Sequence, residues 1–164
     1  MAVTSSRKAK VTLPSDSQIS IVREFDAPKH LVYRAYTEPD LIKRWWSGDR
    51  GVVTSVQVDL RVGGNWRYVM KANEGFEVAF HGQYREIVPN ERLVSTEVYE
   101  GIPDPESAAA LDTATFTEKD GKTTLSILQQ LPSKEVRDAI INSGMEGGMN
   151  EAFDHLEEVA KSLR

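Results

Sequence analysis

Apolar and polar residues alternate over residues 18–25, where Ile19 and Ile21 stand among polar neighbours. This period of two predicts a β-strand. Beyond it, apolar residues recur at spacings of three and four, first over residues 29–36 and then over residues 38–46, and each segment has a proline near its start. Proline is well tolerated in the first turn of a helix, so these patterns predict two short helices.

The middle of the chain consists of β-prone segments separated by turn residues such as Gly-Gly, Asn-Glu-Gly and Lys-Asp-Gly. Short turns of this kind join antiparallel strands. The predicted segments are 52–60, 65–72, 76–88, 93–100, 111–117 and 123–130. Together with the first strand they predict one antiparallel sheet of about seven strands.

Apolar residues return to helical spacing near the C-terminus, where Met145, Met149, Phe153 and Leu156 fall on one stripe. This pattern predicts one long helix over residues 133–163, whose stripe must be buried against the sheet. Strands and helices do not alternate along the chain, which excludes a doubly wound parallel sheet. The predicted fold class is α+β, with a curved antiparallel sheet wrapped around the long C-terminal helix.

Residues 1–16 show no sustained periodicity and are mainly polar, so we predict a flexible N-terminal arm ahead of one domain over residues 17–164. A chain of 164 residues is long enough to build one hydrophobic core.

Composition narrows the classes of function. The chain has no cysteine, which excludes a disulfide framework and a thiolate metal site and agrees with a cytoplasmic location. Its three histidines lack metal-ligand spacing, and no phosphate-binding or dinucleotide motif is present, so we expect neither a metal nor a cofactor. The net charge of −5 is spread along the chain, and no apolar run is long enough to span a bilayer, so we expect no nucleic acid and no membrane as partner.

A sheet that curls around a helix leaves a space unless large side chains fill it. Strand alternation and the helical stripe point several large apolar side chains at this space. These wall candidates are Trp46, Trp66, Tyr68, Phe80, Tyr99, Met145, Met149 and Phe153. A pocket for a small molecule and a closely packed core both fit the pattern. Gly147 and Gly148 fit either a cavity floor or close packing of the helix on the sheet.

Glu97 is the most informative polar residue. It shares one face of its strand with Leu93 and Ser95, whereas the opposite face carries β-branched residues. The pattern does not decide which face points inward. An inward Glu97 would be a buried carboxylate able to contact a ligand, and it is the one weak candidate for a catalytic group. An outward Glu97 would be an ordinary solvated side chain.

The order of elements and several motifs resemble a known family. The motifs are F-D-A-P-K-H-L-V-Y-R-A-Y-T-E-P-D-L-I-K-R-W-W (25–46), V-D-L-R-V-G-G-N-W-R-Y (58–68), H-G-Q-Y-R-E-I-V-P-N-E-R-L-V (81–94), S-T-E-V-Y-E (95–100) and G-M-E-G-G-M-N-E-A-F-D-H-L (144–156). The chain resembles the branch of the START-like, or Bet v 1-like, SRPBCC superfamily named for the activator of the heat-shock-protein-90 ATPase. The resemblance implies a helix-grip fold and places Glu97 where related proteins often have a cavity-side tryptophan.

We therefore expect a binding protein that takes a small hydrophobic molecule between the sheet and the C-terminal helix, with Glu97 as a polar contact. Two alternatives stay open. One is an enzyme of the cyclase, aromatase or hydrolase type that uses the same cavity. The other is a chaperone-modulating interaction module that acts through its exterior. The sequence leaves open the ligand, a protein partner and the oligomeric state, including a homodimer.

Overall fold

The computed structural model of the protein describes residues 8–164. Within them one antiparallel sheet has the strand order β1-β2-β8-β7-β6-β5-β4-β3. The strands are β1 (Lys10–Thr12), β2 (Gln18–Phe25), β3 (Gly51–Val58), β4 (Asn65–Ala72), β5 (Glu77–Val88), β6 (Arg92–Tyr99), β7 (Ala110–Lys119) and β8 (Lys122–Gln130). Most neighbours in the sheet follow one another in the chain, because short turns join them as predicted.

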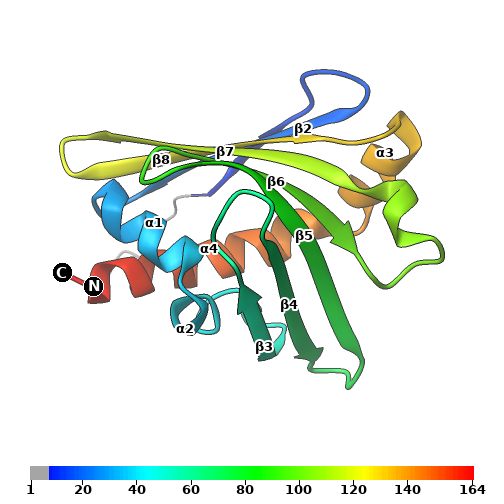
Figure 1. Ribbon diagram of the computed structural model, residues 1–164, viewed down its shortest axis with the longest axis horizontal. Helices are drawn as coiled ribbons and strands as arrows, with labels where there is room; N and C mark the ends of the chain where they lie inside the picture. The colour runs from blue at the N-terminus through cyan, green and yellow to red at the C-terminus, as the bar shows by residue number, and fades with distance from the viewer. Residues whose placement is uncertain (1–7) are drawn as a thin grey trace.

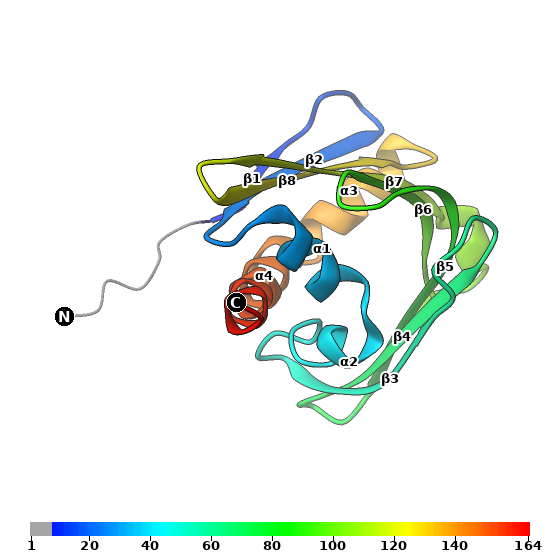
Figure 2. The ribbon, with the colours of Figure 1, turned by 60° about the vertical axis from the view of Figure 1, so that its left-hand side comes forward.

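Helices occupy the concave side of this sheet. They are α1 (Lys29–Thr37), α2 (Pro39–Ile42), α3 (Lys134–Asn142) and α4 (Met145–Ser162). A short 3₁₀ helix, η1 (Pro105–Ala108), lies between β6 and β7 in the chain and contacts the outer face of the sheet, where Glu106 pairs with His81. Figure 2 shows the sheet as an arc around α1, α2 and α4. The predicted α+β helix-grip architecture, with two short helices after the strand at 18–25, is confirmed.

Strand β1 was not among the predicted strands. Residues 10–12 pair with β2 in antiparallel register, so the prediction of a flexible arm over residues 1–16 is wrong for this segment. The backbone N–H of Ala9 also donates a hydrogen bond to Oδ1 of Asn150 at 2.8 Å. Three residues are too few to show a period, so their order comes from pairing with a neighbouring strand. Residues 1–7 lie outside the described residues.

The predicted C-terminal helix over residues 133–163 is divided into α3 and α4. The break lies at Ser143 and Gly144, and Gly144 has a φ of +82°. Glycine adopts this left-handed conformation at low cost, and it commonly follows the end of a helix. The prediction of one unbroken helix is therefore wrong at this point, and α4 lies along the concave side of the sheet (Figure 1).

The main core lies where α1 and α4 meet the first and last strands. Phe25, Val32, Phe116, Leu125 and Leu156 are at most 1% exposed and come from β2, α1, β7, β8 and α4. Burial of this apolar surface is the main force that holds the two layers together.

A buried arginine ties α4 to β2. Arg23 is 1% exposed, and its guanidinium lies 4.9 Å from the ring centre of Phe25. Its Nη1 is 3.0 Å from Oδ1 of Asp154, and its Nη2 is 3.6 Å from Oε1 of Glu157. The other oxygen of Glu157 accepts a hydrogen bond from the backbone N–H of Asp26 at 2.7 Å. A charge removed from water needs such partners, so these contacts fix where α4 lies on the sheet.

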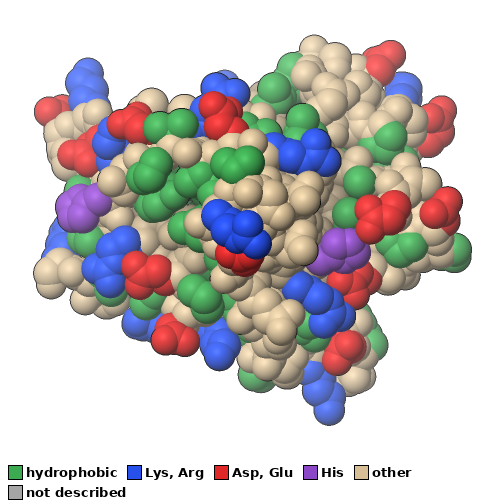
Figure 3. Space-filling model, in the orientation of Figure 1, with side chains coloured by type: hydrophobic (Ala, Val, Ile, Leu, Met, Phe, Trp, Pro, Cys, Tyr) green, Lys and Arg blue, Asp and Glu red, His purple; other side chains and the backbone are tan. Residues whose placement is uncertain are grey.

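Charged side chains of both signs are interspersed on the face shown in Figure 3. This distribution agrees with a net charge of −5 that is spread along the sequence. No helix formed by residues 8–164 is long and apolar enough to cross a membrane.

Candidate functional site

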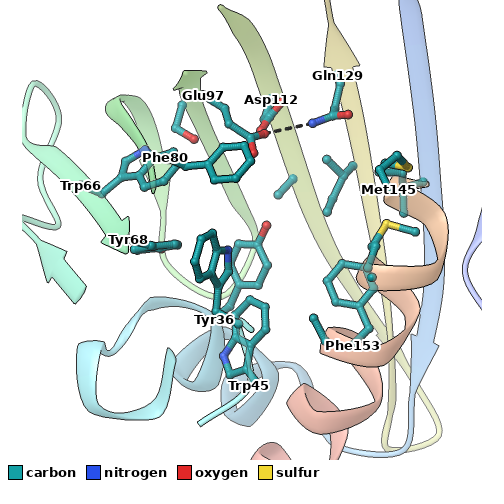
Figure 4. A pocket seen from close by; sticks show the side chains of 18 of the residues that line it. Tyr36, Trp45, Trp66, Tyr68, Phe80, Glu97, Asp112, Gln129, Met145 and Phe153 are labelled. Carbon is teal, nitrogen blue, oxygen red and sulfur yellow. Dashed lines mark hydrogen bonds between the residues drawn. The ribbon is translucent and has the colours of Figure 1, made fainter. Parts of the chain in front are cut away.

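A cavity of about 380 Å³ lies between the concave face of the sheet and α4. Its lining comes from β2 and β4 to β8, from α4, and from the segment that runs from α1 to β3 (Figure 4). Small-molecule sites in proteins commonly enclose roughly 300–1,000 Å³, so this volume suits a compact organic molecule.

One wall of the cavity is a group of aromatic rings on β4, β5 and the turn after α2. The ring centre of Trp46 lies 5.4 Å from that of Tyr68 and 5.7 Å from that of Phe80, both edge to face. The rings of Trp66 and Tyr68 are 4.7 Å apart. A Cβ at Gly82 would lie 2.6 Å from Nε1 of Trp66, so a glycine on β5 is what lets this indole lie against the sheet.

The opposite wall combines α1 with α4. The rings of Tyr36 and Trp45 are stacked 5.8 Å apart, and Trp45 lies 6.5 Å from Phe153. Nε1 of Trp45 donates a hydrogen bond to the carbonyl oxygen of Ala35 at 2.8 Å, which fixes the indole. Figure 4 shows the hydroxyl of Tyr36 directed into the cavity from this wall. Tyr36 falls in the helix predicted over residues 29–36 but is not among the predicted wall candidates.

The predicted wall residues differ in one case from the observed lining. Those that line the cavity, with Glu97, are Trp46, Trp66, Tyr68, Phe80, Met145, Met149 and Phe153. Tyr99 does not: it is the last residue of β6, is 40% exposed, and lies with its ring centre 5.1 Å from that of Phe80. At the end of a strand, alternation no longer determines where a side chain points. That the lining residues bind a ligand stays a prediction.

One end of the cavity is polar. Glu97 on β6 points inward, and Asp112 on β7 and Gln129 on β8 join it. Strand register brings them together, because Asp112 is paired with Ser95 on one side and with Gln129 on the other. Nε2 of Gln129 donates a hydrogen bond to Oε1 of Glu97 at 3.0 Å (Figure 4). We call Glu97, Asp112 and Gln129 the polar cluster.

Burial and a neighbouring carboxyl group favour a protonated Asp112 in the polar cluster. Burial raises the pKa of Asp112 well above its usual range, the negative charge of Glu97 and a hydrogen bond to it raise this pKa further, and a hydrogen bond with Gln129 lowers it. Two neighbouring carboxyl groups away from water do not both ionise readily, because their charges repel. Protonation of Asp112 beside Glu97 is therefore favoured over two negative charges at this site. Oδ1 of Asp112 and Oε1 of Gln129 are buried without a hydrogen-bond partner.

Three tyrosines lie near this cluster. Burial raises the pKa of Tyr36 above its ordinary value, and the charges of Asp112 and Glu97 add to the effect. Burial also raises the pKa of Tyr68 well above its ordinary value and that of Tyr84 to about 12, and the two hydroxyls are hydrogen-bonded to each other. All three are neutral hydroxyl groups at neutral pH and can both donate and accept hydrogen bonds.

Arg50 crosses α4 where two glycines leave room for it. Its Nη2 lies 3.1 Å from Oε2 of Glu151. A Cβ at Gly147 would lie 3.0 Å from Nη2 of Arg50, and a Cβ at Gly148 would lie 3.8 Å from Cζ. The space above these glycines is therefore occupied by the guanidinium, while Gly148 also lines the cavity. The two glycines therefore leave room for the guanidinium of Arg50, which is close packing, and Gly148 also forms part of the cavity wall.

The prediction from sequence did not include Asp112 or Gln129. Asp112 shares one face of its strand with Ala114 and Phe116, and Gln129 shares one with Ile127, so alternation within the predicted strands places both inward. The usable signal was a polar residue on an otherwise apolar strand face, the same signal that singled out Glu97.

Chemically, the cavity can hold an apolar body between aromatic rings and meet a polar group at one end. Among residues 8–164, no three or more His, Cys, Asp or Glu side chains are grouped in a way that could hold a metal ion.

Solved bacterial structures share this fold. A crystal structure of a protein from Rhodobacter sphaeroides has a TM-score of 0.86 at 24% identity, covering 94% of this chain and 99% of that chain. A solution structure from Arthrobacter aurescens has a TM-score of 0.82 at 25% identity, with 93% and 91% covered. A crystal structure from Chromobacterium violaceum has a TM-score of 0.77 at 27% identity, with 89% and 98% covered. A comparison with curated proteins finds no significant match.

A family model supports the resemblance found in the sequence. The model described as Activator of Hsp90 ATPase homolog 1-like protein matches residues 26–161, which is most of the chain. The fold of this family is, in general, of a ligand-binding type. The chain therefore belongs to the Activator of Hsp90 ATPase homolog 1-like family.

Proposed function

We propose that the protein binds a small, mainly apolar organic molecule in the cavity between the sheet and α4. The observation that supports this best is the aromatic cavity of about 380 Å³ in the middle of an otherwise well-packed domain. Protein interiors are close-packed, and a space of this size is rare unless it serves a ligand. Transfer of apolar ligand surface from water supplies the affinity, at about 25 cal/mol per Å².

Two features of the lining support this function. Met145 and Met149 lie on the α4 side, and their flexible thioethers can adapt to the shape of a ligand. The polar cluster lies at one end, where it can orient a molecule that carries a polar group. Binding sites typically combine a mainly apolar lining with a few placed polar groups of this kind.

Filling the cavity tests the proposal. Ala114 is 3% exposed and lines the cavity, so Ala114→Leu places a larger side chain inside it. Binding of the uncharged fluorescent probe N-phenyl-1-naphthylamine is measured by its emission increase. We expect the wild-type protein to bind the probe and Ala114→Leu to weaken binding by about tenfold, because overpacking costs roughly 1–3 kcal/mol.

Ala139→Leu is the matched control, because Ala139 is exposed on α3. Its affinity for the probe should equal that of the wild type. Gly148→Leu is a second variant that narrows the cavity from α4, and it replaces Ala114→Leu if that variant fails to fold by circular dichroism. Equal binding by a folded cavity-filling variant and by the control, or no binding by the wild-type protein, would overturn the proposal.

An enzyme that uses Glu97 and a chaperone-modulating module remain predictions. A module that acts only through its exterior is expected to have a filled interior. The open aromatic cavity favours ligand binding over that alternative.

A further inference from the structure

The polar cluster has more hydrogen-bond acceptors than donors. Gln129 donates one N–H to Glu97, and a hydrogen bond also joins the carboxyl groups of Asp112 and Glu97. Oδ1 of Asp112 and Oε1 of Gln129 remain buried without a partner. An unpaired buried acceptor is unfavourable. A ligand that brings N–H donors to this end of the cavity can form the hydrogen bonds that the protein does not supply.

Within residues 8–164, the structure places no unpaired basic side chain at this end of the cavity. Arg50 is the one basic side chain among the lining residues that the structure describes, and it is paired with Glu151. The charges that act on Asp112 come from Glu97, and those that act on Tyr36 come from Asp112, Glu97 and Tyr84. The polar cluster is therefore acidic, and the described part of the chain provides no counter-charge for it.

The aromatic walls add to this preference. The ring of Trp46 lies between those of Tyr68 and Phe80, with ring centres 5.4 Å and 5.7 Å away and both contacts edge to face. The faces of such rings attract cations, most strongly when water is excluded. A carboxylate at the same place would meet a like charge, and a purely apolar group would leave the acceptors unpaired.

Resting on the proposed function, we propose that the ligand is an amine with an apolar body, whose protonated nitrogen binds Glu97 and Asp112 while the body lies between the aromatic walls. The inference names the class of ligand for the cavity. It also predicts a proton balance: as the cation binds, the proton held by Asp112 and Glu97 leaves to solvent, and the pair becomes more negative.

The experiment uses three molecules with the same aromatic body: 2-(1-naphthyl)ethylamine, 2-(1-naphthyl)ethanol and 1-naphthylacetic acid. They are a cation, a neutral molecule and an anion at pH 7. Affinities are measured by isothermal titration calorimetry. We expect the amine to bind about tenfold or more tightly than the alcohol, because a charge-assisted hydrogen bond is stronger than a neutral one, and the acid to bind most weakly.

Variants test whether Glu97 and Asp112 cause the preference for the amine. In the double variant Glu97→Gln/Asp112→Asn the advantage of the amine over the alcohol should fall below about threefold, while the alcohol still binds. Glu77→Gln is the control, because it removes one carboxylate from an exposed position on β5. It should leave the order of the three affinities unchanged.

Proton release gives a second readout that a merely structural role would not produce. Titrations of the amine in buffers of different ionisation enthalpy should show release of up to one proton per bound molecule, and titrations of the alcohol should show none. The titratable groups that face the pair are Tyr36, Tyr68 and Tyr84, whose raised pKa values keep them neutral throughout. Among the protein groups, the carboxyl pair is therefore the source of the proton, so release should disappear in Glu97→Gln/Asp112→Asn, whereas a proton lost by the amine itself would still be released there.

The outcomes separate this inference from the proposed function. If the alcohol or the acid binds as tightly as the amine, or if the preference survives in the double variant, the ligand class is wrong and cavity binding stands. If none of the three molecules binds and N-phenyl-1-naphthylamine does not bind either, both proposals fail.

Discussion

Two parts of the concave face are filled in different ways. Where α1 and α4 lie on β2, β7 and β8, large side chains such as Phe25, Phe116 and Leu125 are at most 1% exposed. Strands β4, β5 and β6 curve away from α4 (Figure 2), and rings such as Tyr68 and Phe80 there line the cavity. Both parts have apolar residues at inward positions, so inward direction alone does not make a packed core.

The difference follows from how near a helix lies to each part. Arg23 and its acidic partners hold α4 against β2, and Tyr36 and Trp45 fill the space beside it. Against β4 and β5 the aromatic contacts come from Trp46, which follows α2, and from side chains of the strands themselves. Removing side-chain volume should therefore lower stability most in the packed part. In the open part, changes of charge or added volume should have the clearer effects on stability and ligand binding.

The largest effect is expected from truncation in the packed part. Phe116 is 0% exposed and contacts Tyr33 and Tyr36 edge to face, so Phe116→Ala should lower the free energy of unfolding by about 3–5 kcal/mol. Phe80→Ala should lower it by less than about half as much, because one side of that ring already faces a cavity. Urea unfolding at equilibrium measures both. Equal losses would show that the two parts are packed alike.

A change of charge in the open part should have a smaller, pH-dependent effect. The pKa of Asp112 is raised in the folded protein, so its contribution to stability is fully present below its unfolded pKa of about 3.9 and is lost as pH rises through the folded pKa. Asparagine cannot ionise, so Asp112→Asn does not lose stability as the pH rises. We expect the variant to be more stable than the wild type at pH 8, and the difference to shrink toward pH 5.

Thermal unfolding between pH 5 and pH 9 provides the measurement. Asp16→Asn is the control, because Asp16 is exposed in the turn before β2. A stability difference for Asp112→Asn that is the same at every pH would contradict a proton held in the polar cluster.

The smallest effect is expected from the glycines of α4. Gly148→Ala should raise the free energy of unfolding by up to about 1 kcal/mol, because alanine favours helix and the nearest atom of Arg50 would be 3.8 Å away. Gly147→Ala should raise the free energy of unfolding by less, because its methyl group would be 3.0 Å from Nη2 of Arg50. In an Arg50→Ala background the two variants should become equal by differential scanning calorimetry. A gap that persists there would show that Arg50 is not the cause.

The architecture could be predicted because it depends on local patterns and a resemblance. Alternation located the main strands, helical spacing located α1 and α4, and glycine-containing turns indicated antiparallel neighbours. Two features of the fold were not predicted. One depends on pairing with a distant strand and the other on a single backbone angle. Residues 10–12 are ordered by pairing with β2, and Gly144 divides the last helix with a φ of +82°.

The candidate site was predicted less completely. Trp66, Tyr68 and Phe80 were placed correctly on the inner face, because period two is reliable in the middle of a strand. Tyr99 was not, because it ends its strand. Asp112 and Gln129 carried the same signal as Glu97, but only the strand register shows that these polar residues stand together on β6, β7 and β8.

By itself, the sequence determined the fold class, the antiparallel order of most strands and the inward direction of most lining residues, since periodicity and turn chemistry act over a few neighbouring positions. Only the tertiary structure decided that a cavity remains beside the packed core and that two carboxyl groups share one end of it. Both depend on sheet curvature and on register between strands far apart in sequence. These bring together residues whose local patterns hold no information about each other.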